Sequence, residues 1–333
     1  MNVTPRDPGG ETTAIEPATA DSYGVRPPDF RLPPSTRIHS VTLQVSDLAR
    51  SREFYEHTLG FRVLGQSASR LMLGVHGSEK PLIELRERRG ASTSMRRKSL
   101  GLYHVAILLP TRAALGRFLR HLGQHGVRAG AGDHFVSEAL YLQDPDDLGI
   151  EVYADRPQAA WTRRGRELVM GTDALDMRDL LAAGGTEQWR GTPAGTTIGH
   201  VHLHVGDIDT ASRFYAEAVG FDRMVWSYPG ALFMAAGGYH HHLGTNIWAG
   251  AGAQPAAADD PQLLEWTLHV PTRDDVAAAA ASIANAGHVA ESVDGDASIV
   301  TRDPWGTALR IAVATPEPRE SSKTVAERTQ NVR

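Results

Sequence analysis

The chain has 333 residues, enough for two domains with substantial cores, and its composition is that of a soluble globular protein. Its formal net charge is -5 and its only basic cluster is short, at residues 96–98, so a nucleic-acid partner is not expected. Cysteine is absent, which excludes disulfides and thiolate chemistry and leaves His, Asp and Glu as the metal-binding side chains.

The two ends of the chain differ in composition from the rest. Residues 1–36 are rich in Pro, Thr, Asp and Glu and lack the apolar stretch of a signal peptide, so they are predicted to form a disordered leader. Residues 315–333 are polar and are predicted to form a disordered tail. No segment has the apolar run of a membrane span, and the protein is expected to be cytoplasmic.

An internal repeat organises the residues between these ends. The segment VTLQVSDLARSREFYEHTLGF at 41–61 returns as VHLHVGDIDTASRFYAEAVGF at 201–221, which is 160 positions later. Each copy reads as strand, helix, strand. Asp47 is placed to cap the N-terminus of the helix, and Gly60 suits the left-handed conformation that ends it.

A second kind of unit follows each copy of the first. Its Pro-Thr-Arg step at 110–112 returns at 271–273, and Asp144-Pro145 returns as Asp303-Pro304. The first step ends a strand before a helix, and the Asp-Pro step marks a turn between later strands. The helices are predicted over residues 113–123 and 274–286.

The chain therefore contains four modules of two alternating kinds. Modules one and two predict a domain over residues 37–155, and modules three and four predict another over residues 198–314. Residues 156–197 contain Pro157, a Gly/Pro/Thr-rich stretch and a short helix predicted over 173–183, which is typical of a connector.

One strand of module three carries three histidines on one face. In IGHVHLHV at 198–205, alternation places His200, His202 and His204 opposite apolar side chains. A second run, His240-His241-His242, follows in the same module. Neutral histidine is the commonest metal ligand, although a solvated surface explains either run alone about as well.

Comparison of corresponding strands reduces this ambiguity. His104 in module two matches His200, whereas module one has Ser40 there. In module two Glu151 follows Asp144 by seven residues, and a Glu inside an apolar strand is costly unless it pairs with a cation or binds a metal. Two histidines and one carboxylate favour non-haem Fe(II), with Mn(II) as an alternative.

Module four lacks such residues, because Glu265 or Trp266 stands at the histidine position and Arg310 at the glutamate position. We therefore expect modules two and three to face each other, with one and four as a supporting pair. If modules one and two paired instead, His104 and Glu151 would face Ser40 and Glu84.

Several segments, in order, resemble the type I extradiol ring-cleaving dioxygenases of the vicinal oxygen chelate superfamily, most closely its catechol 2,3-dioxygenase branch. The resemblance covers about residues 37–313, and the segments that carry it are GLYHVAILLP, GDHFVSEALYLQDPD, GIEVYADRP, IGHVHLHV and GGYHHHLGTNIWAG. It implies an α+β fold of four βαβββ modules paired into two open barrels of mixed sheet, with the helices outside.

The resemblance also implies roles for individual residues. His104, Glu151 and His200 match the metal ligands of the family. His241 matches best the acid/base histidine on the last strand of its module, with His242 as the near rival.

Two further residues match positions that contact substrate in the family. Tyr141 stands ten residues before Glu151, like the tyrosine that hydrogen-bonds substrate, and His134 beside Asp133 resembles the histidine before it. Taken alone, Tyr141 reads as a half-buried strand aromatic and His134 as a solvated loop residue. Tyr228 and Trp248 either shape the pocket or fill the core, and the core is favoured.

The implied reaction is extradiol cleavage of a catechol-type diol by dioxygen at Fe(II), which gives a muconic semialdehyde. The expected partners are the small aromatic diol and dioxygen, without nucleic acid or membrane, and a homo-oligomer is left open. Two alternatives belong to other classes: an oxygen-independent, glyoxalase-like metal isomerase or lyase, and a metal-free protein that sequesters small molecules such as drugs.

Overall fold

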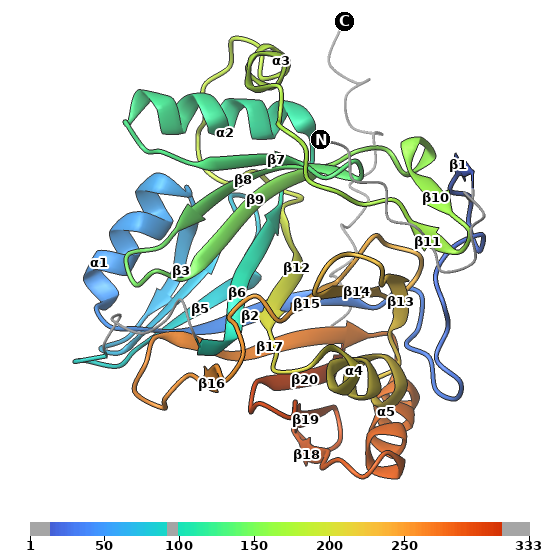
Figure 1. Cartoon of the computed structure of the whole chain (residues 1–333). Helices are drawn as coiled ribbons and strands as arrows, with labels where there is room; N and C mark the ends of the chain where they lie inside the picture. Colours follow the sequence, from blue (N-terminus) through green and yellow to red (C-terminus); the bar gives the residue numbers. More distant parts are fainter. Residues whose placement is uncertain (1–13, 92–98, 315–333) are drawn as a thin grey trace, which may run out of the picture.

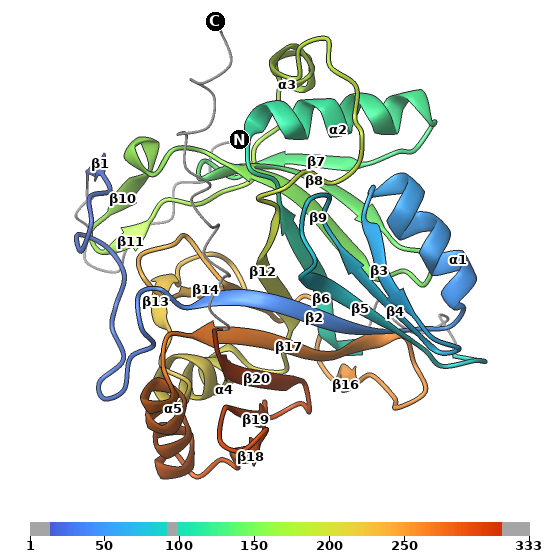
Figure 2. The ribbon, with the colours of Figure 1, turned by 180° about the vertical axis from the view of Figure 1, so that it is seen from behind.

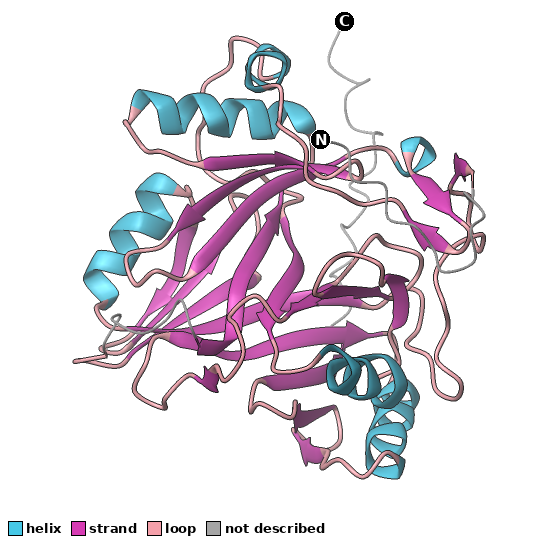
Figure 3. Cartoon of the chain, in the orientation of Figure 1, coloured by secondary structure: helices cyan, strands magenta, loops and turns pink. Residues whose placement is uncertain are grey.

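The computed structural model describes residues 14–91 and 99–314, which form two large mixed sheets with helices on their outer sides (Figures 1 and 3). The predicted disordered tail, residues 315–333, lies outside the described residues. So do the first 13 residues of the predicted leader and the basic cluster at 96–98. The α+β fold of four modules in two paired sheets is confirmed.

The first sheet joins module two to module three, and we call it the β6–β12 sheet after its central strands. Its order is β13 (Asp222–Val225), β14 (Ala231–Ala235), β15 (Leu243–Asn246), β12 (Thr197–His204), β6 (Ser99–Leu108), β9 (Gly149–Asp155), β8 (Ser137–Gln143) and β7 (Gly130–Asp133), and the short β16 (Gln254–Pro255) pairs with β6. Strands β6 and β12 are antiparallel, and the pairing of modules two and three is confirmed.

The second sheet joins module one to module four, and we call it the β2–β17 sheet. Its order is β18 (Glu291–Val293), β19 (Ser298–Arg302), β20 (Ala308–Val313), β17 (Gln262–Val270), β2 (Arg37–Val45), β5 (Pro81–Glu87), β4 (Arg70–Gly74) and β3 (Arg62–Gln66). Strands β2 and β17 lie side by side in Figure 2. Ser40 and Glu84 are therefore in the other sheet from His104, which rules out the alternative pairing.

The helices form where the sequence predicts them. Helix α1 (Leu48–Glu53) continues into a π-helical turn, as does α4 (Ile208–Ala211) in the repeated module. Asp47 caps α1 by accepting the Arg50 backbone N–H at 3.0 Å, and Gly60 has a φ of 84°.

The other helices are α2 (Arg112–Gln124), α5 (Arg273–Asn285) and α3 (Met177–Ala183). Each begins or ends within a few residues of its predicted bounds. Among the described residues, no helix is both long enough and apolar enough to cross a membrane.

The two faces of strand β6 separate the core from the site. Val105 and Ile107 are buried in the main hydrophobic cluster with Phe118 of α2, on the helix side of the sheet. His104 and Ala106 therefore point to the opposite face, as the alternation of a strand requires. That face is where the chemistry-bearing side chains gather.

The repeated tyrosines and Asp-Pro steps hold neighbouring modules together. The Tyr55 hydroxyl donates to Asp144 Oδ2 at 3.2 Å, and the Tyr215 hydroxyl donates to Asp303 Oδ2 at 2.9 Å. The other oxygen of each aspartate accepts backbone N–H groups of its own turn. These repeated residues are structural, because buried polar groups need partners.

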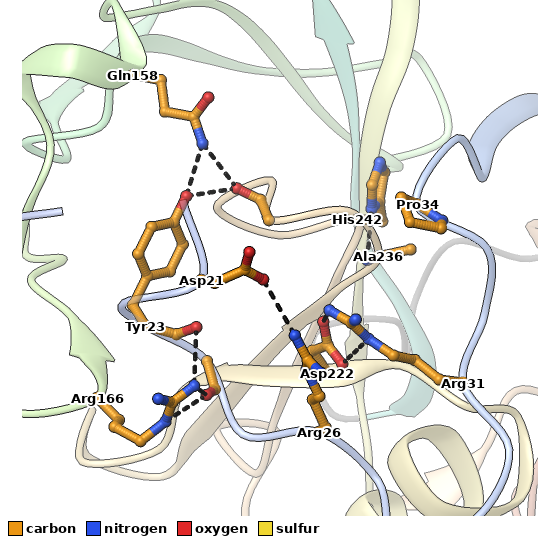
Figure 4. Close-up of polar contacts among 12 residues, drawn as sticks. Asp21, Tyr23, Arg26, Arg31, Pro34, Gln158, Arg166, Asp222, Ala236 and His242 are labelled. Carbon is orange, nitrogen blue, oxygen red and sulfur yellow. Dashed lines mark hydrogen bonds and ion pairs between the residues drawn. The ribbon is translucent and has the colours of Figure 1, made fainter. Parts of the chain in front are cut away.

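The N-terminal segment differs from its prediction, because residues 14–36 are ordered against the rest of the chain. Strand β1 (Ile15–Pro17) pairs with β10 (Thr162–Arg164), which also pairs with β11 (Glu167–Leu168). Tyr23 and Leu32 are buried, and Arg31 pairs with Asp222 (Figure 4). The predicted disordered leader is therefore wrong for residues 14–36, which we call the strap: a few buried anchors hold it despite its polar composition.

In the β2–β17 sheet an ion pair takes the place of the histidine and glutamate of module two. Arg310 pairs with Thr267 in the register, as Glu151 pairs with Ala106 in the other sheet. The Arg310 Nε lies 2.8 Å from Glu265 Oε1, so a guanidinium occupies the position that Glu151 has in module two. This explains why modules one and four provide no matching cluster.

The stacked rings of His39 and His269 in this sheet predict a pH-dependent stability. Burial, with smaller effects from His39 and Lys80, lowers the pKa of His269 to about 4, and burial and Lys80 also lower the pKa of His39. The unfolded chain binds protons at these two histidines as the pH falls below about 6.5, whereas the folded chain does not. The free energy of unfolding is therefore highest above pH 6.5 and decreases as the pH falls towards 4. Replacing His269 with Gln should make the fall in melting temperature from about pH 7 to about pH 5 shallower, and an equally steep fall would contradict this account.

Candidate metal centre and active site

Three side chains from adjacent strands converge on one point of the β6–β12 sheet. His104 is on β6, Glu151 on β9 and His200 on β12. Glu151 Oε2 lies 3.0 Å from His104 Nε2 and 3.3 Å from His200 Nε2, and the two Nε2 atoms are 3.3 Å apart. Within the described residues, this is the one group of three such side chains close enough to share a metal ion.

The donor set fits a divalent metal ion. Ligand atoms that lie about 2.1 Å from one ion, at roughly right angles around it, are separated by about 3 Å, which matches the observed triangle. All three residues are buried, and the ion pairs of Glu151 in the described chain are with these two histidines. A buried carboxylate between two imidazoles is well suited to hold a cation with them.

The electrostatics of the cluster favour the same conclusion. Burial lowers the pKa of His200 to about 4, against the opposing effect of Glu151, so this imidazole is neutral and has a free lone pair near neutral pH. Burial acts to raise the pKa of Glu151, but His200 and His104 outweigh it and keep that pKa well below its ordinary value. The cluster thus offers the neutral imidazole of His200, the imidazole of His104 and one carboxylate.

A cavity of about 350 Å³ opens beside the three donor atoms. That volume is within the range of small-molecule sites. Aromatic and apolar side chains form much of its wall: Tyr103, Met170, Tyr228, Phe233 and Trp248. The remaining wall is polar and includes His134, Tyr141, His202 and His241. The cavity therefore combines an apolar wall for a ring with polar groups beside the metal cluster.

The structure distinguishes His241 from His242 by position. Both lie in the loop before β15 rather than on a strand. His241 lines the cavity, and its ring centroid is 4.0 Å from that of His200. His242 does not line it, and its Nδ1 accepts the Ala236 backbone N–H at 3.2 Å. Of the two predicted acid/base residues, only His241 faces the cluster.

His134 and Tyr141 are joined by a hydrogen bond whose direction is fixed. His134 Nδ1 lies 2.8 Å from the Gly171 carbonyl oxygen, which only accepts, so Nδ1 carries the proton. His134 Nε2 must then accept the Tyr141 hydroxyl, 2.5 Å away. Tyr141 is paired with Glu151 in the register of β8 and β9, which places its hydroxyl beside the cluster.

Part of the wall comes from residues that the sequence placed in the connector. Met170, Gly171 and Thr172 line the cavity opposite the sheet. A Cβ on Gly171 would lie 2.6 Å from the ring of Phe135, so a larger residue here would require that exposed ring to move. The residue types of this segment do not indicate a contribution to the site, because the segment shapes the cavity wall and supplies no ionisable side chain.

Asn246 orients the second histidine of the strand face. Its Oδ1 accepts the Trp248 backbone N–H at 3.0 Å and His204 Nδ1 at 2.6 Å, so its amide nitrogen donates to His202 Nε2 at 2.9 Å. His202 thus lines the cavity, and His204 supports it. Trp248 is 44% exposed and, like Tyr228, lines the cavity, so of the two alternatives both residues shape the pocket, and Tyr228 also packs against a buried cluster.

The fold and the sequence together place the chain in a known superfamily. The chain belongs to the Glyoxalase/Bleomycin resistance protein/Dioxygenase superfamily, whose family model matches residues 37–152 and 197–311. It is 43% identical over 272 residues to the catechol-2,3-dioxygenase of Bacillus subtilis (strain 168). The aligned residues cover 81% of this chain and 94% of that protein.

Solved structures share the fold. A proposed dioxygenase from Bacillus subtilis subsp. subtilis str. 168 superposes with a TM-score of 0.60 and 16% identity over 86% of this chain and 87% of that one. A glyoxalase I variant from Zea mays gives a TM-score of 0.50 and 15% identity over 84% and 92% of the two chains. At these identities the likeness concerns the fold alone.

Proposed function

We propose that this protein is an extradiol dioxygenase that opens the ring of a catechol-type diol to a muconic semialdehyde. The observation that carries the proposal is the cluster of His104, Glu151 and His200 at the wall of a cavity of about 350 Å³. The 43% identity to a catechol-2,3-dioxygenase across most of both chains supports this chemistry over others that the superfamily hosts.

We further propose that these three residues hold Fe(II). Two imidazoles and one carboxylate are the donor set typical of non-haem Fe(II) oxygenases, and Mn(II) accepts the same donors. When bound, such an ion supplies the electron-transfer chemistry with dioxygen and the attachment of a diol that amino-acid side chains do not provide.

The protein's own side chains would position the diol and move its protons. Tyr103, Phe233 and Trp248 form an apolar wall against which the ring can pack. Tyr141 reaches the same cavity with its hydroxyl oriented by His134. His241, neutral because burial keeps its pKa well below the ordinary value, has a ring nitrogen suited to accept and return a proton.

Oxygen uptake by protein loaded anaerobically with Fe(II), measured together with the yellow ring-fission product, tests the proposal. We expect catechol to trigger both signals in a one-to-one ratio. Parallel samples loaded with Mn(II) identify the working metal, and Zn(II)-loaded protein serves as a control because that ion has no redox chemistry.

The contrary outcome also has a defined meaning. Iron-loaded protein that takes up no oxygen with catechol or substituted catechols would overturn the proposal and favour an oxygen-independent isomerase or lyase. Failure to bind any divalent ion stoichiometrically would instead favour a small-molecule-binding protein.

A further inference from the structure

We propose that Asp155 and His240 fix the tautomer of His241, so that its Nε2 presents a lone pair to the cavity. This inference rests on the proposed function for its catalytic consequence. The observation behind it is a continuous chain of contacts: Asp155 Oδ1 lies 2.9 Å from His240 Nε2, and His240 Nδ1 lies 2.7 Å from His241 Nδ1. Asp155 ends strand β9, the strand that carries Glu151.

The direction of each hydrogen bond follows from the carboxylate. An ionised carboxylate only accepts, so His240 Nε2 donates to Asp155. In the tautomer with its single proton on Nε2, His240 has Nδ1 as an acceptor. His241 Nδ1 must then donate to His240, and the unprotonated nitrogen of His241 is Nε2.

Two tyrosines strengthen this end of the chain. The Tyr239 hydroxyl donates to Asp155 Oδ1 at 3.2 Å. Its proton is thereby committed, so the Tyr153 hydroxyl, 2.6 Å away, donates to Tyr239. Tyr239 thus gives Asp155 a second hydrogen-bond donor besides His240, and Tyr153 orients Tyr239.

The backbone is shaped to admit this arrangement. A Cβ on Gly199 would lie 1.8 Å from the Tyr153 hydroxyl oxygen, so only glycine leaves room for it beside His200. On the outer side, the Tyr23 hydroxyl donates to the Gly238 carbonyl at 2.7 Å, and Gln158 donates to both oxygens (Figure 4). The loop that carries His240 and His241 is therefore held from both sides.

The consequence is a positioning role for two residues that do not line the cavity. With Nε2 unprotonated, His241 is ready to accept a proton from a bound diol at the start of the reaction. The opposite tautomer would present an N–H and would need a rearrangement first. The three buried histidines thus differ in role. His241 faces the reaction, His240 orients His241, and His242 is held by the backbone.

Imidazole nitrogen shifts from NMR test the tautomer directly. In the full chain, labelled with 15N-histidine and loaded with diamagnetic Zn(II), we expect His241 to show a protonated Nδ1 and an unprotonated Nε2. His242 provides an internal control, because the Ala236 N–H makes its Nδ1 the unprotonated nitrogen. Asp155→Ala should replace the single His241 tautomer by a mixture and leave His242 unchanged.

Asp155→Asn is the matched variant, because its amide oxygen still accepts from His240 and should restore the His241 pattern. In the Fe(II)-loaded enzyme, Asp155→Ala should lower kcat by about tenfold to a hundredfold, the usual effect of losing an orienting partner, with KM changed by less than about twofold. Asp155→Asn should recover most of kcat.

Two results would overturn the inference: a protonated His241 Nε2 in the unaltered protein, or an unchanged His241 pattern in Asp155→Ala. The unchanged His242 signals show that each variant is folded. If the iron-loaded protein cleaves no catechol, the proposed function fails, but the nitrogen shifts of the Zn(II)-loaded chain still decide the tautomer.

Discussion

Replacing Glu151 with alanine is expected to abolish metal retention and turnover while the protein stays folded. Glu151 is the only carboxylate in the described three-residue cluster, and two imidazoles alone hold a divalent ion weakly. Loss of an orienting outer partner costs about tenfold to a hundredfold in metal affinity, so loss of this ligand should cost more than about a hundredfold. Metal content after gel filtration and calorimetric titration with Fe(II) under nitrogen measure the effect.

The fold should tolerate the change because burial of the Glu151 carboxylate already costs free energy in the metal-free protein. Removing that charge relieves its desolvation, which offsets the lost contacts with His104 and His200. The melting temperature of metal-free Glu151→Ala should therefore stay close to that of the parent. The isosteric variant Glu151→Gln fills the same volume and separates loss of charge from loss of packing.

Glu138 provides the matched control. It is buried on the neighbouring strand β8, but it pairs with Arg112 at 2.5 Å and Arg156 at 2.9 Å and does not line the cavity. Glu138→Ala should lower the free energy of unfolding by about 1–2 kcal/mol and leave metal binding intact. Metal retained by Glu151→Ala, or lost equally from Glu138→Ala, would show that the assigned ligands are wrong.

Much of the candidate metal cluster could be predicted from the sequence, because its residues lie on regular strands. Strict alternation fixes which side chains share a face, so the match of His104 with His200 survives any error in strand ends. The pairing of modules two and three was predictable from chemistry, because Arg310 in module four stands where module two has Glu151. A site cannot be completed across a sheet whose matching position carries a cation.

The choice between His241 and His242 was beyond the sequence, because both lie in an irregular loop where no periodicity sets the direction of a side chain. The link from Asp155 to His240 joins residues 85 positions apart on two modules, and neither position has a counterpart in the repeat that signals it. Such contacts follow from the packing of the modules, and local pattern does not contain them.

The strap escaped prediction for a different reason. Its composition is that of a disordered segment, and disorder is the correct expectation when a segment cannot bury enough apolar surface by itself. Here single residues use surface prepared by the rest of the fold. Leu32 is 1% exposed and Tyr23 is 6% exposed, and a Cβ on Gly237 would lie 2.0 Å from the Pro34 carbonyl oxygen.

Replacing Arg31 with alanine is expected to destabilise the protein by about 2–3 kcal/mol. Arg31 donates to both oxygens of Asp222, at 2.8 and 2.5 Å, and the side chain of Asp222 is only 5% exposed. Removing one partner leaves a buried carboxylate without its cation, which costs more than the pair contributes when intact. Arg31 itself is 32% exposed, which places the estimate below the range for fully buried pairs. Chemical unfolding of the metal-free protein measures the change.

Arg26→Ala is the control on the same strap (Figure 4). Arg26 pairs with Asp21 at 3.0 Å, but both side chains are well exposed, and such surface pairs contribute less than about 1 kcal/mol. We therefore expect the two arginine variants to differ by at least about 1 kcal/mol in unfolding free energy. Because the strap also holds the loop of His240 and His241 through Tyr23, Arg31→Ala should lower kcat as well, and Arg26→Ala should not. Equal effects of the two substitutions on stability and kcat would contradict this account, because they would show that the pair of Arg31 with buried Asp222 contributes no more than the exposed pair of Arg26 with Asp21.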